Sequence, residues 1–252
     1  MPIELAVVMP VHNEESAIEG VLRSWLEALA ALGVGFRILV LDDGSTVCTP
    51  AVLDAFRSDG RVDVAAHQNV GHGPTILKGY RRAADLAEWA FQCDSDGEIP
   101  AECFAGLWNL RHGADAVLGV RTDRRQRPAR RLVSLGARGA VRLLFGARSP
   151  DPNCPFRLVR SGVLKAIVSR IPDDCFAPNV ILSGVLLSGD FRVQTLPVEA
   201  GPRRGGSTSL AGLRAVRSAA KAFAQTVAWR RACAGEAAAE AALHRAPGEV
   251  GR

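Results

Sequence analysis

The chain has 252 residues, of which 48% are hydrophobic and 23% are charged, and its formal net charge is +5 at pH 7. This composition is typical of a globular protein and excludes disordered and collagen-like chains. The longest apolar runs, residues 5–11 and 180–187, are much shorter than the roughly 20 residues that cross a bilayer. Glu4 stands where a secretory leader has basic residues, so we expect neither a membrane-spanning helix nor a leader.

The first 120 residues alternate between strand-like and helix-like patterns. Short apolar runs predict strands at residues 5–9, 36–41, 62–66, 89–93 and 116–120. Apolar residues at helical spacing predict the intervening helices, which begin after Asn13, an expected N-cap, and near Pro50, Pro74 and Pro100. Continuous apolar strands that alternate with helices are typical of a largely parallel sheet, so the expected fold class is α/β.

The second half of the chain is less regular. Apolar patterns predict helices within residues 121–148 and at 163–169 and 179–188, and strands at 156–160 and 191–198. Residues 210–232 predict an amphipathic helix, whose apolar stripe is Leu213, Val216, Ala220, Phe223 and Val227. We therefore expect a single domain over residues 1–209, followed by this helix and a frayed tail within residues 210–252.

Positive charge is concentrated in two stretches. Residues 121–148 contain nine arginines against one acid, Asp123, and residues 203–231 contain seven lysines or arginines and no acid. Segregated positive charge indicates a polyanionic partner, which would be nucleic acid, an anionic lipid headgroup or a phosphorylated substrate. Aromatic residues make up only 6% of the chain and do not alternate with the arginines as base-stacking platforms would, so we expect no nucleic-acid partner.

The six cysteines form no C-x-x-C pair and have no spacing typical of a zinc site. Free thiols in a reducing compartment are the simplest account of such a set. We therefore expect a cytoplasmic protein.

The most informative motif is Asp94-Ser95-Asp96, which directly follows the apolar run 89–93. Residues i and i+2 of an extended segment point to the same side, so both carboxylates can face one ion. Hard divalent cations take oxygen ligands and commonly share them with substrate phosphates. The same three residues are also ordinary turn formers. Alone, the motif therefore leaves a metal site and a solvated turn as alternatives.

Three further polar loops are expected beside this motif. In an open α/β sheet, ligands bind beyond the carboxyl ends of the strands. The four segments that follow predicted strands on that edge are His12–Glu15, Asp42–Ser45, Asn69–Gly73 and Asp94–Glu98. Their acidic and glycine-rich composition predicts a site for a nucleoside diphosphate.

The order of these motifs resembles family 2 glycosyltransferases, which have the GT-A fold. The motifs that carry the resemblance are residues 8–15 (VMPVHNEE), Asp42–Ser45, Asn69–Gly73 and Asp94–Asp96. Later segments resemble the branch that makes dolichyl- or polyprenyl-phosphate sugars, and these are Gly119–Arg121, Asp151, Phe156-Arg157 and residues 203–208. The resemblance covers residues 3–210. It implies an inverting enzyme that takes a sugar from a GDP- or UDP-linked donor.

The resemblance also implies which residues bind the donor. It divides the domain into a nucleotide-sugar half, residues 1–120, and an acceptor half, residues 121–209. It assigns donor contacts to Pro10, Val11, Glu14, Asp42, Asp43, Gly71, Gly73 and Asp94. It assigns Mg²⁺ or Mn²⁺ to Asp94 and Asp96, with Glu98 as a third acidic member where the branch often has glutamine.

Two kinds of acceptor remain open. A lipid phosphate is already anionic and needs cationic positioning, for which Arg121, Arg131 and Arg203 are the candidates. A hydroxyl acceptor needs a carboxylate base, for which Asp151 is the candidate, although the Asp151-Pro152 pair is equally typical of a turn. A non-catalytic module that binds nucleotide sugars or anions is a third alternative.

The basic helix expected at residues 210–232 has two interpretations. A basic amphipathic helix can lie on anionic lipid, which would place the protein peripherally on the inner face of a membrane. Its apolar stripe can instead pack back on the domain. The sequence leaves both open.

Overall fold

The computed structural model describes residues 2–46, 48–122, 128–201 and 213–243, and within these it does not describe the side chains of 128–133, 213–216 and 235–243. The described residues form a seven-stranded sheet with the order β3-β2-β1-β4-β6-β5-β7. The strands are β1 (Leu5–Val11), β2 (Phe36–Asp43), β3 (Val62–His67), β4 (Trp89–Gln92), β5 (Ala116–Arg121), β6 (Arg157–Arg160) and β7 (Val193–Val198). Strand β6 is antiparallel to both neighbours, and the other neighbouring pairs are parallel. The prediction of a largely parallel α/β sheet is confirmed.

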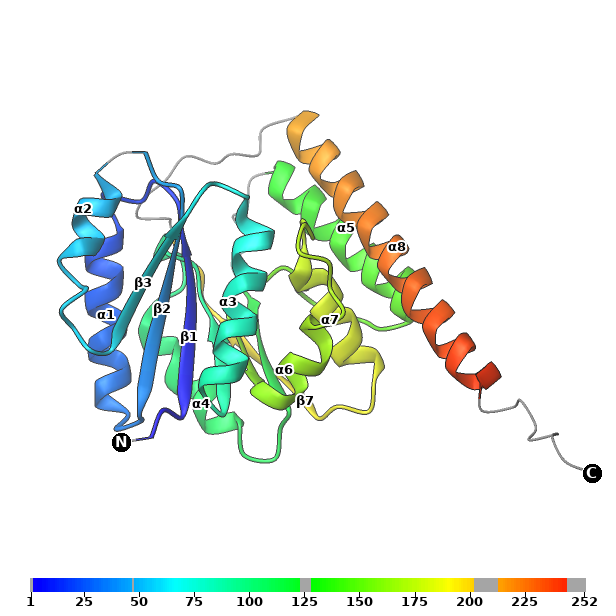
Figure 1. Ribbon diagram of the computed structural model, residues 1–252, viewed down its shortest axis with the longest axis horizontal. Coiled ribbons are helices and arrows are strands. Elements are labelled where there is room, and N and C mark those ends of the chain that lie inside the picture. Colours follow the sequence, from blue (N-terminus) through cyan, green and yellow to red (C-terminus); the bar gives the residue numbers. More distant parts are fainter. Residues whose placement is uncertain (1, 47, 123–127, 202–212, 244–252) are drawn as a thin grey trace, which may run out of the picture.

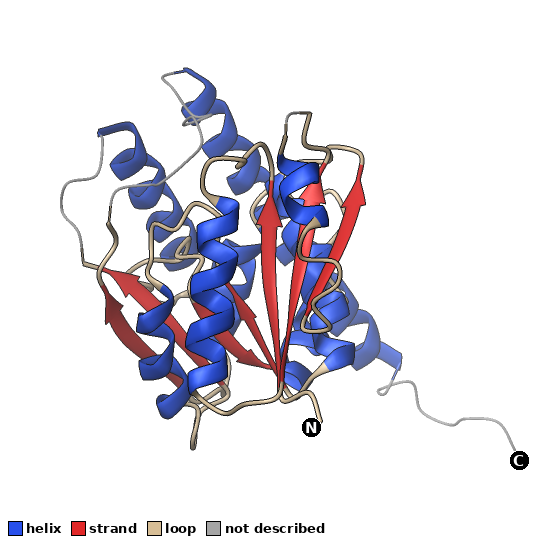
Figure 2. Ribbon diagram, turned by 90° about the vertical axis from the view of Figure 1, so that its left-hand side faces the viewer, coloured by secondary structure: helices blue, strands red, loops and turns tan. Residues whose placement is uncertain are grey.

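Helices cover both faces of this sheet (Figures 1 and 2). They are α1 (Ile18–Ala31), α2 (Thr49–Asp54), α3 (His72–Leu86), α4 (Phe104–Leu110), α5 (Pro128–Phe145), α6 (Ser161–Val168), α7 (Pro178–Ser188) and α8 (Leu213–Leu243). A short 3₁₀ turn, Ala101–Cys103, precedes α4. Each helix predicted from apolar spacing is present, with most ends displaced by a few residues. The exception is α8, which continues to Leu243, so the expected end at residue 232 is wrong: the alanine-rich segment that follows favours helix.

Two hydrophobic cores lie on opposite faces of the sheet. Successive strand residues point to opposite faces, so Leu5, Val7 and Met9 of β1 pack with α1, α2 and α4. Ala6 and Val8 of the same strand join the core that contains residues of α3, α5, α6, α7 and α8. The sheet is therefore buried on both sides, as its uninterrupted apolar strands predict.

Helix α1 shows how the apolar pattern produces this packing. Its buried residues are the six of the predicted face, Ile18, Val21, Leu22, Trp25, Leu26 and Leu29. The helix begins at Ile18, four residues later than a cap at Asn13 requires, and its N-cap residue Ala17 makes no side-chain hydrogen bond. The expected Asn13 cap is therefore wrong, whereas the buried face is confirmed.

Helix α8 lies along α5 (Figure 1) and is attached to the domain. Its buried side chains, within residues 217–234, are Thr226 and Trp229. The indole Nε1 of Trp229 donates a hydrogen bond to the carbonyl of Arg170 at 2.8 Å. The same ring lies 6.1 Å from the ring of Phe145, measured between centroids. The helix therefore packs back on the domain.

The face that packs is not the predicted apolar stripe. Of that stripe, Ala220 is exposed and Val227 is half-buried, and Phe223 is 40% exposed. At 3.6 residues per turn, Trp229 lies on the side of the helix opposite Ala220. The large indole ring, which has more apolar area to bury than alanine or valine, determines which face is inward. None of the described helices combines the length and apolarity needed to cross a membrane.

Candidate functional site

The carboxyl ends of the parallel strands bring the predicted polar loops to one edge of the sheet. In the strand register, Val11 of β1 lies opposite Asp42 of β2, and Asp43 lies opposite His67 of β3. Asp94 follows β4 on the other side of β1, because Val8 is opposite Gln92. The prediction that these loops share an edge is confirmed.

Asn13 joins the loops that follow β1 and β2. Its backbone nitrogen donates to Ser45 Oγ at 3.0 Å, and its side-chain Oδ1 accepts from the backbone nitrogen of Thr46 at 2.9 Å. The backbone φ of Asn13 is 54°, a left-handed conformation that asparagine tolerates better than most residues. Asn13 thus clamps two loops of the site together instead of capping α1.

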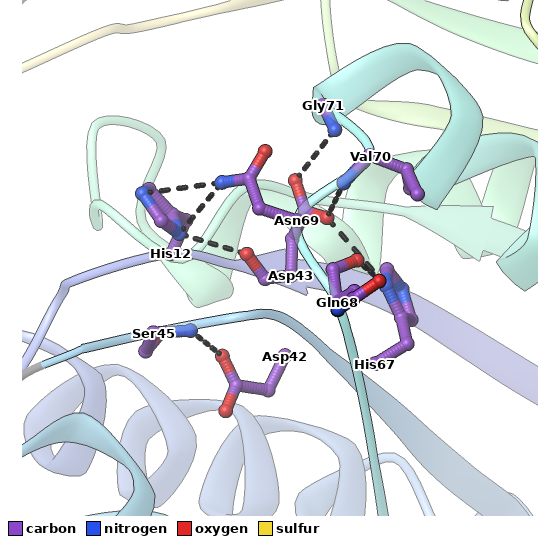
Figure 3. Close-up of polar contacts among 9 residues, drawn as sticks. All are labelled: His12, Asp42, Asp43, Ser45, His67, Gln68, Asn69, Val70 and Gly71. Carbon is purple, nitrogen blue, oxygen red and sulfur yellow. Dashed lines mark hydrogen bonds and ion pairs between the residues drawn. The ribbon is translucent and has the colours of Figure 1, made fainter.

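Asp43 holds the loop that precedes α3 (Figure 3). Its Oδ1 accepts a hydrogen bond from the backbone nitrogen of Val70 at 2.7 Å, and its Oδ2 accepts one from that of Gly71 at 3.0 Å. His67 Nδ1 lies 3.5 Å from Oδ1. Both carboxylate oxygens are therefore used to shape the loop. A contact of Asp43 with the nucleotide stays a prediction.

The other proposed nucleotide residues lie around the same edge. Asp42 is buried, and its Oδ1 accepts from the backbone nitrogen of Ser45 at 3.0 Å (Figure 3). Glu14 is half-buried, and its backbone nitrogen donates a hydrogen bond to Thr49 Oγ1 at 3.0 Å. Pro10 and Val11 are buried within β1. Contacts of these residues with the nucleotide stay predictions.

The glycines before and within α3 are required by the backbone. Gly71 has a φ of 94°, which a residue with a side chain rarely adopts. A Cβ atom on Gly73 would lie 2.3 Å from the carbonyl oxygen of Phe176 and 2.4 Å from that of Cys175. Between them, His72 Nε2 lies 3.9 Å from Asp94 Oδ1. The glycine loop and the Asp94 loop therefore adjoin.

The segment Asp94–Glu98 contains the candidate metal ligands. The Asp94 side chain is 23% exposed, whereas Asp96 and Glu98 are 5% and 7% exposed. Asp96 Oδ1 accepts from the backbone nitrogen of Glu98 at 3.0 Å. The described residues include no group of three His, Cys, Asp or Glu side chains placed to share one ion. One or two carboxylates that share Mg²⁺ with substrate phosphates are common, so an ion at Asp94 and Asp96 stays a prediction, whereas the expected third ligand, Glu98, is not grouped with them to share one ion.

A buried polar network supports Asp94 from within the sheet. Gln92 Oε1 accepts hydrogen bonds from Tyr80 Oη at 2.7 Å and from Asn179 Nδ2 at 2.9 Å. Because the carbonyl end is used in this way, Gln92 Nε2 points to Asp94 Oδ1, at 3.4 Å. Burial raises the pKa of Tyr80 well above its ordinary value, so the phenol stays a donor. The sequence signal for this network is a glutamine within a buried strand, which requires a partner.

We predict that Tyr80→Phe lowers the free energy of unfolding by about 1–2 kcal/mol, since it removes a buried donor from the accepting Gln92. Tyr80 is the only tyrosine of the chain, so tyrosinate absorbance reports on it alone. In the folded protein the phenol should not ionise near pH 10. Its contribution to stability is complete below the unfolded pKa of about 10 and is lost as the pH rises above it. Ionisation of the folded protein near pH 10 would contradict this placement.

Arg121 and Asp151 form a buried ion pair at the end of β5. The guanidinium donates from Nε to Asp151 Oδ2 at 2.7 Å and from Nη2 to Oδ1 at 2.9 Å. Each side chain is 5% exposed. Burial lowers the pKa of Arg121, but the hydrogen bonds and charge of Asp151 outweigh it, with help from Glu98, and the net effect raises that pKa. Backbone hydrogen bonds join this end of β5 to the Asp94–Glu98 segment through β7, since Thr122 N donates to the Val198 carbonyl at 3.0 Å and Gly201 N donates to the Glu98 carbonyl at 2.7 Å.

Arg157 organises the loop that carries Asp151. Its guanidinium is 2% exposed and donates to the carbonyl oxygens of Pro152 at 3.1 Å and Cys154 at 2.5 Å. It also donates to the carbonyl of Asn179 at 3.2 Å. The loop is therefore fixed against α7 by a buried cation, and this role explains a residue that the sequence offered only as a motif and as part of a strand.

Two of the predicted arginines are not placed in the site. Arg131 lies in α5, and its side chain is outside the described residues, as is the whole of Arg203. All six cysteines are free thiols. Their expected lack of pairing is confirmed.

Comparison with known proteins identifies relatives of this arrangement. Residues 6–167, more than half of the chain, match the family model described as Glycosyl transferase family 2. An undecaprenyl-phosphate 4-deoxy-4-formamido-L-arabinose transferase of Pseudomonas paraeruginosa is 31% identical over 70% of this chain and 53% of its own length. The transferase of the same name from Edwardsiella ictaluri is 26% identical over 77% of this chain and 58% of its own length. The chain thus spans about half the length of these curated relatives.

Solved structures share the fold. Glucosyl-3-phosphoglycerate synthase from Mycobacterium tuberculosis, in complex with Mn²⁺, UDP-glucose and phosphoglyceric acid, has a TM-score of 0.61 at 18% identity and covers 89% of this chain and 80% of its own. S. aureus TarS 1–349 in complex with UDP-GlcNAc has a TM-score of 0.57 at 20% identity, over 84% of this chain and 62% of its own. The expected GT-A fold is confirmed.

Proposed function

The chain belongs to glycosyl transferase family 2, and from this premise we propose that it transfers a sugar from a nucleoside-diphosphate sugar to a polyprenyl phosphate, with inversion. One observation carries the proposal. The segment of Asp94 and Asp96 and the buried Arg121 lie at one edge of the sheet, where Arg121 is opposite Val198 of β7 and Gly201, just after β7, donates its backbone N–H to the Glu98 carbonyl at 2.7 Å. A group for a donor diphosphate and a group for an acceptor anion thus adjoin.

The donor side requires negative charge to be stabilised as the sugar leaves. A divalent cation bound at Asp94 and Asp96 would supply this Lewis-acid stabilisation. Gln92 orients the Asp94 carboxylate through Nε2, and Asp43 holds the backbone of the glycine loop beside it. His72 adds an exposed imidazole 3.9 Å from Asp94. These residues place the diphosphate and limit its movement.

The acceptor side favours a phosphate over a hydroxyl. A hydroxyl acceptor needs a carboxylate that can take its proton, but each oxygen of Asp151 is already paired with an N–H of the Arg121 guanidinium. A phosphate monoester is already anionic and needs a positioned cation. In this proposal Asp151 fixes the Arg121 guanidinium, and Arg121 orients the attacking phosphate oxygen. The names of the curated relatives, which are undecaprenyl-phosphate transferases, support the same acceptor class.

The direct test is a donor screen with purified protein, Mn²⁺ and labelled UDP- and GDP-sugars, with and without polyprenyl phosphate. We expect a labelled product that partitions into organic solvent and forms only when the lipid phosphate is present. Transfer only to a water-soluble hydroxyl acceptor would refute the lipid-phosphate acceptor and leave the family intact. Such a result would return Asp151 to the role of a base.

We also propose that α5 and α8 together present a surface to anionic lipid. Their exposed apolar residues are Leu135, Leu143 and Phe223. Among the described side chains, the exposed cations on the same two helices include Arg138, Arg142, Arg217 and Lys221. Apolar side chains among cations are typical of a peripheral membrane surface. A lipid-linked acceptor would reach the site from such a surface.

We predict that the protein sediments with phosphatidylglycerol vesicles and not with phosphatidylcholine vesicles. The double variant Leu143→Ser/Phe223→Ser should bind about tenfold more weakly, because it removes apolar area from the lipid contact. Leu86→Ser is the matched control, since Leu86 is a 36% exposed leucine at the end of α3. Equal loss in the control and the double variant would exclude this surface.

A further inference from the structure

We propose that helix α8 positions the donor loop, and thereby sets the affinity for the donor nucleotide, through the linker between α6 and α7. This α6–α7 linker is residues 169–177. The inference rests on the proposed donor site, but its linker and α8 lie beyond residue 167, where the family match ends. Three sets of contacts carry it.

The first set joins the linker to α3, the helix that follows the donor loop. Gly73 lies so close to the linker that an added Cβ would be 2.3 Å from the Phe176 carbonyl and 2.4 Å from that of Cys175. Lower on α3, Arg81 Nη2 donates to the carbonyl of Ile171 at 2.8 Å, and Arg81 forms an ion pair with Asp173. The linker therefore rests against α3 at both of its ends.

The second set joins the linker to α8, where Trp229 bonds to the carbonyl of Arg170 at the start of the linker and Gln225 binds the end that contacts Gly73. Gln225 Oε1 accepts a hydrogen bond from the backbone nitrogen of Phe176 at 2.7 Å. Gln225 Nε2 donates to the carbonyl of Asp174 at 3.2 Å. The ammonium of Lys221 lies 5.7 Å from the centre of the Phe176 ring. One glutamine thus satisfies both a donor and an acceptor of the linker backbone.

The third set joins the start of α3 to the nucleotide edge. Asp43 binds the backbone nitrogens of Val70 and Gly71, immediately before α3. The contact of Gly73 with the linker is made by backbone atoms, which cannot change rotamer to absorb a displacement. A shift of Phe176 must therefore move the first turn of α3. Gln225 is a positioning residue for the donor loop, although it lies on a helix outside the nucleotide half.

The test compares Gln225→Met, which keeps the side-chain length and removes both hydrogen bonds, with Arg230→Met. Arg230 donates from Nε to the carbonyl of Leu144 on α5 at 3.1 Å, so its loss loosens α8 without touching the linker. The dissociation constants of UDP and GDP with Mn²⁺ are measured by calorimetry, beside the melting temperature of each variant. We expect about three- to tenfold weaker nucleotide binding in Gln225→Met. Arg230→Met should bind as the wild type does.

Gln225→Glu is the second variant, because a carboxylate keeps the acceptor for the Phe176 nitrogen and loses the donor to Asp174. Its nucleotide affinity should lie between those of the wild type and Gln225→Met. Unchanged affinity in both Gln225 variants would overturn the inference and leave the proposed function standing. Equal weakening in Arg230→Met would also overturn it, since general loosening of α8 would then suffice. A wild type that binds neither nucleotide would overturn the donor site and this inference together.

Discussion

Replacement of Asp96 by alanine is expected to lower sugar transfer by about 10³-fold, because a cation at a departing diphosphate supplies several kcal/mol of charge stabilisation. The Asp96 side chain is buried, and its Oδ1 also accepts a hydrogen bond from the backbone nitrogen of Glu98. The loss should therefore appear both in the rate and in the Mn²⁺ dependence of nucleotide binding. Initial rates at saturating donor, with a titration of Mn²⁺ against bound nucleotide, measure the two effects.

Asp54→Ala is the control for this experiment. Asp54 is an exposed aspartate at the end of α2, where it pairs with Arg57. An exposed ion pair contributes little to stability, so transfer should be unchanged in that variant. Asp96→Asn keeps an oxygen for the Glu98 nitrogen and should separate loss of the metal from loss of the turn. Undiminished transfer in Asp96→Ala would contradict the assignment of a metal ion to Asp94 and Asp96.

The fold could be predicted because it follows from short-range patterns. The strands are apolar runs, and the buried face of α1 consists of the six residues that share one side of a helix. In a parallel sheet every strand end that precedes a helix reaches the same edge. The placement of Asp94 and the Asn69–Gly73 loop on one edge follows from this rule, but β2 and β1 separate the strands that precede them, so their adjacency does not.

Side-chain partners could not be predicted in the same way. Asn13 is a good cap by residue type, yet it bonds to Ser45 and Thr46, more than thirty positions away. Asp43 and Asp151 are good ligands by residue type, but their oxygens accept hydrogen bonds from Gly71 and Arg121 respectively. A carboxylate in a sequence shows its chemistry and not its partner. Whether it binds substrate or supports the site depends on contacts that only the folded chain makes.

The face of α8 shows a different limit. The predicted stripe counted apolar residues at helical spacing, but Trp229 on the other side takes the buried position, with its indole bonded to Arg170. The apolar area that one large side chain buries can exceed that of several small ones and so determines which face of a helix packs on the domain. The predicted stripe counted each apolar residue once, although tryptophan buries far more apolar area than alanine. This error concealed Gln225, which the structure joins to the α6–α7 linker.

Replacement of one partner of the buried Arg121–Asp151 pair is expected to lower the free energy of unfolding strongly. Arg121→Met leaves the Asp151 carboxylate buried without its cation, and Asp151→Leu leaves the guanidinium buried without its anion. Removal of one partner from such a pair costs about 3–5 kcal/mol. The double variant Arg121→Met/Asp151→Leu should recover most of that stability, because both buried charges are gone. Chemical denaturation of the four proteins measures the interaction energy as a double-mutant cycle.

The stable double variant should be inactive with either acceptor, because it lacks both Arg121 and Asp151. A fifth protein, Asp151→Asn, distinguishes a phosphate acceptor from a hydroxyl acceptor. The first case is that Arg121 binds the acceptor phosphate. Asp151→Asn, which keeps a side-chain oxygen for Arg121, should then chiefly raise the KM for the lipid phosphate, since it loosens the guanidinium that binds it. If Asp151 is instead a base, Asp151→Asn lowers kcat and removes the acidic limb of the pH–rate profile. A kcat defect with unchanged acceptor KM would therefore contradict Arg121 as the phosphate ligand. Because Arg121 donates hydrogen bonds to both Asp151 oxygens, we expect Asp151→Asn to raise the KM for the lipid phosphate.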